Sequence, residues 1–276
     1  MSEYTVVVGL GNPENVERLM RIGCMMAQQN DGRVEGVTVV EVECEAPEIT
    51  SENHDRMSRA YNVLAAAEEV AEACAVTFEG HLAVGREVAA VLDEVACATD
   101  AALIIVGFSE REHPRGDGSD FDRLVDEIAD AAPCNVLVAR FVGEPKYDRV
   151  LVPVRARLNL DVRRDLVVAL QDQSGSEVDV VHFACSEAEA RDMRVQLDEW
   201  LRERAVEERV TPQVEVREDP AEAIVEASAD YDLVLLGTAP LHEVRRKYFG
   251  AVPEHVANNA SCSTFLIRAH GIWPGG

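Results

Sequence analysis

The sequence predicts an α/β protein made of two tandem domains, each a doubly wound parallel sheet of five strands. Three observations lead to this fold class. Short apolar runs alternate with amphipathic stretches along all 276 residues. The runs are apolar throughout, which is typical of parallel strands covered on both faces. The order of runs and stretches in the first half recurs in the second, so two copies of one unit are expected, each wound by right-handed crossovers.

The first half contains five expected strands and four expected helices. The helix that follows the first strand has a clear start, because Asn12 can cap it, Pro13 suits its first position and Glu14 suits its positive end. The second helix is favoured by an Ala- and Glu-rich composition. The strands are expected at residues 5–8, 34–42, 76–83, 102–107 and 135–141, and the helices at 13–29, 51–73, 87–99 and 121–131.

The second half repeats this order. "DAALIIVG" in the first copy corresponds to "DYDLVLLG" in the second, and "ADAAPCNVLVAR" corresponds to "ANNASCSTFLIR". Gly, Pro and charged residues interrupt the apolar runs in "VGEPKYDR", so the domains are expected at residues 1–143 and 148–276. The strands are expected at 149–154, 177–183, 210–216, 233–237 and 264–268, and the helices at 160–172, 187–208, 221–229 and 251–259.

The chain is strongly acidic, with 51 Asp and Glu against 26 Lys and Arg and a net charge of −25. Such a surface repels nucleic acids and acidic lipids, so neither is expected as a partner. Self-repulsion of this size is best tolerated where salt is abundant, because the Debye length falls to about 3 Å in molar salt. The composition, with only two lysines, is typical of proteins from salt-accumulating archaea; the alternative is an ordinary acidic protein with an arginine-rich codon bias.

Cysteine and histidine usage indicates no disulfide framework and no metal site. The seven cysteines form no CxxC pair, and most lie in apolar segments, so they are expected to be small buried residues in a reducing compartment. The seven histidines show no ligand spacing. No signal peptide is apparent and no apolar run approaches the roughly 20 residues of a membrane span. The expected location is therefore the cytoplasm, without direct membrane insertion.

A known family matches this pattern. An opening strand and loop, a fourth strand that ends in glycine and the segment "LIIVG…VDEIADAAPCNVLVAR" resemble the universal stress protein family. In the nucleotide-binding branch of that family, G-x2-G-x9-G-[ST] holds the ATP phosphates and an Asp after the first strand contacts adenosine. The second copy has Gly237, Pro240, Gly250 and Ala251 at the phosphate positions and Arg155 at the Asp position.

The first copy departs further from that branch. It keeps only Gly107, and it has Glu110 for the second glycine, Asp122 and Arg123 for the final pair and Gly11 for the Asp. An acidic side chain repels phosphate, and Pro240 in the second copy has no amide hydrogen to donate. The resemblance therefore implies degenerate ATP sites in both copies. No cofactor is expected, although ATP or another nucleotide could bind weakly.

Any remaining ligand site is expected in the second copy, because spacing, glycines and positive charge coincide only there. Ligands on doubly wound sheets bind beyond the carboxyl ends of the strands. Two groups of arginines follow the first and fourth strands of this copy and could bind an anion bidentately. The alternative is a solvated loop whose arginines pair with Glu243 and Glu254. The candidate ligand-binding residues are Arg155, Arg157, Gly237, Thr238, Arg245, Arg246, Gly250 and Ala251.

The leading functional hypothesis is a non-catalytic stress-response or regulatory module that acts through a protein partner. The N-P-x-N-V turn resembles the family branch associated with archaeal amino-acid transporters, which implies such a transporter as the partner. The two copies are expected to form an intramolecular pseudodimer, and a homodimer is left open. Two alternatives stay open: a slow nucleotide hydrolase or transferase that uses the second domain, and a purely structural protein on a membrane transporter. No catalytic residue is assigned.

Overall fold

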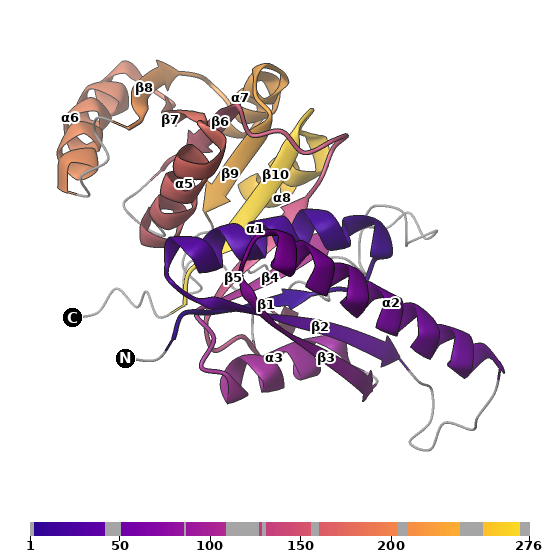
Figure 1. Ribbon diagram of the computed structural model, residues 1–276. Helices are drawn as coiled ribbons and strands as arrows, with labels where there is room; N and C mark the ends of the chain where they lie inside the picture. The colour runs from indigo at the N-terminus through magenta and orange to yellow at the C-terminus, as the bar shows by residue number, and fades with distance from the viewer. Residues whose placement is uncertain are drawn as a thin grey trace. The chain divides into compact units, whose positions relative to one another are not determined.

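Figure 1 shows the computed structural model of the chain, which describes residues 3–41, 51–85, 87–108, 127–128, 131–155, 160–203, 209–237 and 251–270. The chain folds as two compact units, Met1–Val138 and Ala139–Gly276. Each unit is a sheet with helices, so the expected α/β fold class is confirmed. None of the described helices is both long enough and apolar enough to cross a membrane.

The first unit is built on the strand order β3-β2-β1-β4-β5, and β1 to β4 pair in parallel. Val8 and Gly9 are consecutive in β1 and point to opposite faces. A helix α1 glycine, Gly23, lies against Val8, whereas Leu92 of α3 lies against Gly9, so these two helices cover opposite faces. The elements are β1 (Thr5–Gly9), η1 (Pro13–Asn15), α1 (Val16–Gln29), β2 (Arg33–Glu41), α2 (Ser51–Ala73), β3 (Thr77–Gly85), α3 (Val88–Ala98), β4 (Leu103–Phe108) and β5 (Asn135–Arg140).

The second unit repeats this order as β8-β7-β6-β9-β10, again with parallel pairing. Helix α7 contacts β7 and α8, and α8 contacts β10. The elements are β6 (Arg149–Pro153), α5 (Leu160–Ser174), β7 (Glu177–Ala184), α6 (Glu187–Glu203), β8 (Thr211–Val216), α7 (Pro220–Ala227), η3 (Ser228–Asp230), β9 (Leu233–Gly237), α8 (Ala251–Asn259) and β10 (Ser263–Arg268).

Hydrogen bonds show which positions of the two units are equivalent. The amide of Leu10 donates to the carbonyl of Val37 at 2.7 Å, and the amide of Val154 donates to the carbonyl of Val181 at 2.8 Å. Both bonds join the residue after the first strand of a unit to the second strand. Because the central strands are buried along their length, each unit has its own apolar core on both faces of the sheet.

The structure refines two expectations in the first unit. The helix expected from Pro13 begins as the single turn η1, where Asn12 Oδ1 accepts the Glu14 amide at 2.9 Å, so the capping role is confirmed. The expectation of mostly buried cysteines holds for only half of the six described. An apolar segment can still place one residue on the solvent-facing side of an amphipathic helix or just beyond a strand end. Cys24, Cys134 and Cys262 are buried, Cys74 is half-buried, and Cys97 and Cys185 are exposed.

Candidate functional site

The candidate site lies where the neighbouring parallel strands β6 and β9 end. Arg155 is the second residue after the end of β6 and is exposed, and Gly237 is the last residue of β9. Since β6 and β9 are paired, these two residues follow adjacent strand ends. Ala251 is the first residue of α8. The other candidate residues, Arg157, Thr238, Arg245, Arg246 and Gly250, lie outside the described residues, as do Pro240, Glu110, Asp122 and Arg123.

A buried arginine that sequence reasoning missed lies beneath this strand end. Arg163 of α5 is only 4% exposed, and its NH1 donates to the carbonyl of Pro153 at 2.9 Å. Its guanidinium packs against Gly237, so closely that a methyl group added to that glycine would lie 2.9 Å from Cζ. The glycine is therefore required for this packing, whatever the loop beyond it binds.

The charge of Arg163 persists despite its burial. Desolvation lowers the pKa of Arg163 to about 10, because a low-dielectric surrounding disfavours the charged form. That value is still well above neutral pH, so the side chain is a guanidinium under ordinary conditions. A fixed positive charge therefore lies at the carboxyl ends of two parallel strands, where ligands on such sheets bind.

The first unit has an apolar side chain at the equivalent place. Gly107 follows the four buried residues of β4 as Gly237 follows the four of β9, and a methyl group added to Gly107 would lie 3.1 Å from the side chain of Leu19 in α1. Leu19 and Arg163 occupy the same position of corresponding helices, counted from equivalent β1 and β6 residues. The positive charge at this strand end is thus a feature of the second unit.

A buried histidine also holds the backbone just after β6. His182 of β7 is 2% exposed, and its Nδ1 donates to the carbonyl of Val154 at 2.7 Å. Its Nε2 lies 3.3 Å from Glu189 Oε1, and the other oxygen of Glu189 accepts the Cys185 amide at 2.8 Å. In the first unit Thr38 makes the equivalent bond, from its hydroxyl to the Leu10 carbonyl at 3.0 Å.

Together these contacts position the turn that carries Arg155. The carbonyls of Pro153 and Val154 are consecutive, and they accept hydrogen bonds from Arg163 and His182, respectively. The turn is therefore held by two buried side chains from different elements. An exposed arginine that follows β6, at the strand end where a buried guanidinium also lies, can stabilise an anion through charge-assisted hydrogen bonds.

Arg163 and His182 left signals in the sequence. Arg163 precedes Leu166, Val167 and Leu170, which are all buried and lie at the three-, four- and seven-residue spacing of one helix face. An arginine in the apolar stripe of a helix is a candidate for a buried charge, although its long side chain can also reach solvent. His182 similarly interrupts the apolar strand "VDVVHFA". Both signals indicate buried polar groups, but only the fold shows that they meet at one strand end.

Comparisons with known proteins place the chain among two-domain relatives. The model of the universal stress protein family matches residues 4–140 and again residues 146–268. The Na(+)/H(+) antiporter NhaS5 of Synechocystis sp. is 24% identical over an alignment that covers 96% of this chain and 38% of the antiporter. The chain thus spans less than half the length of that relative.

Two solved structures are similar over nearly the whole chain. The cytoplasmic domain of a prokaryotic cation chloride cotransporter superposes with a TM-score of 0.69 at 13% identity, covering 98% of this chain and 97% of that one. A universal stress protein from Archaeoglobus fulgidus superposes with a TM-score of 0.63 at 15% identity, covering 95% and 96%. At these identities the likeness shows the fold.

Proposed function

This chain belongs to the universal stress protein family, and from that premise we propose that it is a non-catalytic regulatory module for a membrane transport protein. The observation that carries the proposal is the match of nearly the whole chain to part of a much longer Na(+)/H(+) antiporter. The likeness to the cytoplasmic domain of a cotransporter supports it, since the same two-domain fold occurs there as part of a transport protein. The N-P-x-N-V turn favours an amino-acid transporter as the particular partner.

The module would act from the cytoplasm and report the presence of an anionic small molecule. The site for that molecule is the end of β6 and β9, where Arg155 is exposed and Arg163 is buried against Gly237. The altered phosphate and adenosine positions make ATP a poor ligand. A regulatory ligand needs only to bind one conformation of the module better than another, so weak binding at millimolar cellular concentration is sufficient.

Cross-linking in cells tests the transporter partner. The chain carrying a photoreactive amino acid on the exposed face of α6 is expressed in its source, and cross-linked proteins are identified by mass spectrometry. We expect a polytopic transport protein to be enriched over a similarly acidic control protein. Enrichment of soluble proteins alone would contradict the transporter link.

ATP binding tests the degenerate sites. We expect Mg-ATP to bind no tighter than roughly millimolar, which is weaker than about −4 kcal/mol. The triple variant Pro240→Gly, Ala251→Ser, Arg155→Asp should bind more tightly, because it restores an amide, a hydroxyl and an adenosine contact. Calorimetry in molar KCl measures both, and phosphate release is assayed in parallel. Micromolar ATP binding or steady hydrolysis by the unaltered chain would favour the nucleotide hydrolase instead.

A further inference from the structure

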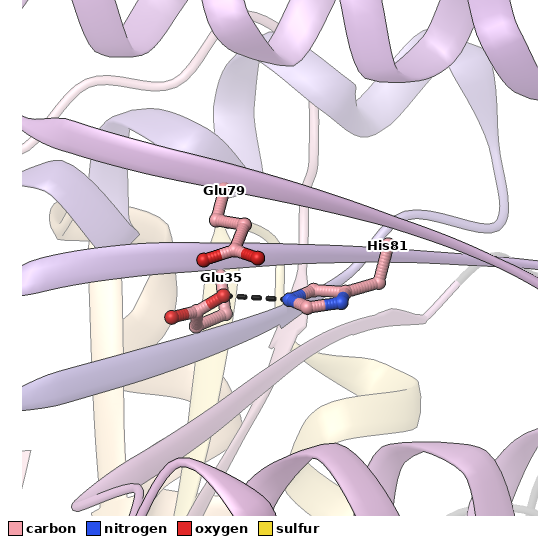
Figure 2. A group of neighbouring side chains, drawn as sticks. All are labelled: Glu35, Glu79 and His81. Carbon is pink, nitrogen blue, oxygen red and sulfur yellow. Dashed lines mark hydrogen bonds and ion pairs between the residues drawn. The ribbon is translucent and has the colours of Figure 1, made fainter.

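Two glutamates and a histidine lie together on one face of the first unit's sheet, at its outer strands (Figure 2). Glu35 of β2 and Glu79 of β3 are register partners, and His81 follows Glu79 by two residues. Residues two apart in a strand point to the same face, so all three side chains converge. One ligand atom of each lies within 4.8 Å of the others.

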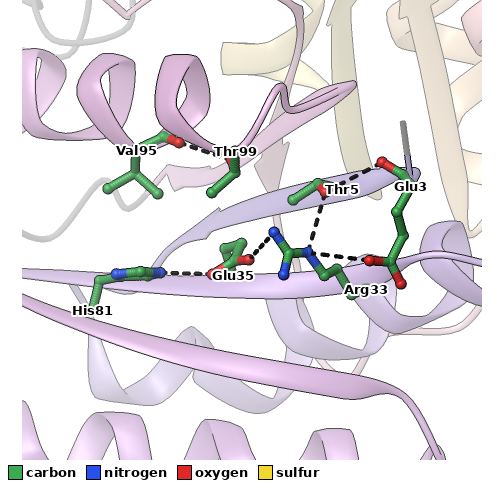
Figure 3. Close-up of polar contacts among 7 residues, drawn as sticks. All are labelled: Glu3, Thr5, Arg33, Glu35, His81, Val95 and Thr99. Carbon is green, nitrogen blue, oxygen red and sulfur yellow. Dashed lines mark hydrogen bonds and ion pairs between the residues drawn. The ribbon is translucent and has the colours of Figure 1, made fainter. Parts of the chain in front are cut away.

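The carboxylate of Glu35 is fully buried, and its charge is incompletely matched. Its Oε2 lies 2.6 Å from His81 Nε2. Its Oε1 forms an ion pair with Arg33 NH2 (Figure 3), with 3.0 Å between the two atoms, but within the described part of the chain it accepts no hydrogen bond. Burying an ionised carboxylate is costly unless it is both paired and hydrogen-bonded. Glu35 therefore retains the capacity to bind further positive charge.

Arg33 cannot supply all of that charge, because it is shared. Its Nε lies 3.7 Å from Glu3 Oε2 and 3.4 Å from Thr5 Oγ1 (Figure 3). Glu3 and Glu35 thus share the guanidinium of Arg33, while Glu35 and Glu79 lie beside the imidazole of His81. A divalent cation among Glu35, Glu79 and His81 would balance the excess negative charge.

The second unit shows what a purely structural carboxylate looks like at the same position. Asp179 of β7 is equivalent to Glu35, since Leu151 pairs with Asp179 as Val7 pairs with Glu35. Asp179 accepts the hydroxyl of Tyr231 at 2.7 Å, which satisfies it with a neutral donor. Its neighbours on β8, at the positions of Glu79 and His81, are Thr211 and Gln213. The glutamate and histidine therefore belong to the first unit alone.

We propose that Glu35, Glu79 and His81 form a binding site for a divalent transition-metal ion. The ligands are His81 Nε2, Glu35 Oε2 and one oxygen of Glu79. Metal bonds of about 2.0–2.2 Å place tetrahedral ligand atoms roughly 3.3 Å apart, so the 2.6 Å contact between Nε2 and Oε2 opens slightly on binding. Any proton on Nε2 passes to solvent, because the ligand must be the neutral ring nitrogen.

The site is open to an ion from solvent, and its chemistry selects the class of ion. Glu79 is exposed, and the side chain of His81 is 31% exposed on the outermost strand of the unit. Mg²⁺ and Ca²⁺ prefer oxygen ligands alone, whereas an imidazole nitrogen with two carboxylates suits ions such as Mn²⁺, Fe²⁺ and Zn²⁺. Water completes the coordination sphere.

Mn²⁺ is the probe of choice, because the exposed thiols Cys97 and Cys185 would compete for zinc. The full chain is freed of metal with a chelator and titrated with Mn²⁺ in molar KCl, which screens non-specific binding to the acidic surface. Loss of the electron paramagnetic resonance signal of free Mn²⁺ reports binding. His81→Gln and Glu79→Gln remove one ligand each, at half-buried and exposed positions where the fold tolerates the change.

We expect one Mn²⁺ per chain, and at least about tenfold weaker binding in His81→Gln and in Glu79→Gln. The matched control is His255→Gln with Glu222→Gln, an exposed histidine and carboxylate 3.3 Å apart in the second unit, which should leave binding unchanged. Mn²⁺ should also raise the melting temperature of the unaltered chain but not of His81→Gln. The site is disproved if His81→Gln binds as the unaltered chain does, if the control variant loses affinity equally, or if equimolar Mg²⁺ displaces Mn²⁺.

Discussion

At the scale of single residues, Tyr231 lies at the amino-terminal end of the second unit's sheet and contacts two neighbouring strands. Its hydroxyl donates to Asp179 Oδ2 at 2.7 Å, and the guanidinium of Arg149 lies 4.8 Å from the centre of its ring. Burial and the hydrogen bond to Asp179 both raise the pKa of Tyr231 above its ordinary value. The residue therefore links the starts of three elements, β6, β7 and β9.

Tyr231→Phe should lower the free energy of unfolding by about 1–2 kcal/mol, because it leaves a half-buried carboxylate without its donor. Above a pH of about 10 the unfolded tyrosine loses its proton while the folded one keeps it, so this residue makes the fold less stable as pH rises. In Tyr231→Phe the free energy of unfolding should therefore fall less steeply with rising pH than in the unaltered chain. Urea unfolding between about pH 8 and 11 measures both effects. Tyr61→Phe, at a position 59% exposed, is the control and should change neither.

Arg163 offers a second test, because the equivalent position of the first unit, Leu19, carries no charge. Arg163→Leu removes the bond to the Pro153 carbonyl together with the buried charge, and the melting temperature of the variant shows whether it still folds. Binding of inorganic phosphate, measured by calorimetry in molar KCl, should fall at least tenfold if the charge serves an anion. Arg164→Leu, next to it on the exposed face, is the control. An Arg163→Leu variant that is less stable but binds phosphate as tightly as the unaltered chain would make the arginine structural.

The residues that meet at the strand ends could be predicted only in part. Arg155 and Gly237 followed from the rule that ligands bind after parallel strands, and both do lie at neighbouring strand ends. The contact between Glu35 and His81 could not be predicted, because the two residues are 46 positions apart and no local spacing joins them. Their meeting depends on the register of β2 against β3, which the sequence does not specify.

At the scale of elements, prediction from periodicity was accurate. The helices Ser51–Ala73 and Ala251–Asn259 and the strand Leu233–Gly237 have the expected limits. The remaining described strands differ by one or two residues at their ends, where hydrogen bonding between strands decides the last pair. Strands buried on both faces give long apolar runs, and helices give a 3.6-residue period, so the two are easily distinguished in this fold.

The turn between α1 and β2 depends on one glycine. A methyl group on Gly32 would lie 2.0 Å from the carbonyl oxygen of Tyr4, a backbone atom that cannot rotate away. Gly32→Ala should therefore lower the free energy of unfolding by about 3 kcal/mol, as overpacking does. Gly11→Ala is the matched control, because no atom lies within 4 Å of its added methyl group. Thermal unfolding compares them, and equal melting temperatures would show that the turn can rearrange.

At the scale of the whole molecule, the two units keep one topology but carry different chemistry. The strand order recurs, and the bonds of Thr38 and His182 occupy equivalent positions. A repeated fold is visible in sequence because each copy must bury the same strands. The different chemistry of the two units is not visible in the same way. A few substitutions at equivalent positions, such as leucine in one unit and Arg163 in the other, are enough to change the charge at a site.

The net charge of −25 acts on the whole chain, and salt is the variable that tests it. The surface ion pair of Arg21 with Glu17, at 2.7 Å, is more than 60% exposed on both sides, and such a pair contributes only about 0.3–0.5 kcal/mol. Salt weakens these pairs, but it also screens the repulsion among 51 acidic residues that only 26 basic ones offset. The repulsion is the larger effect, so stability should rise with salt.

We therefore expect the melting temperature to rise by at least about 5 °C between dilute and molar KCl, which corresponds to one or two kcal/mol for domains of this size. NaCl at equal ionic strength should act alike, since screening does not depend on the cation. Sucrose at equal osmolarity is the control and should have a smaller effect, because it leaves the charges unscreened. A flat or falling melting temperature in both salts would contradict this prediction. It would mean that the acidic side chains lie too far apart to repel one another strongly, and the argument for a salt-rich cytoplasm would then fail.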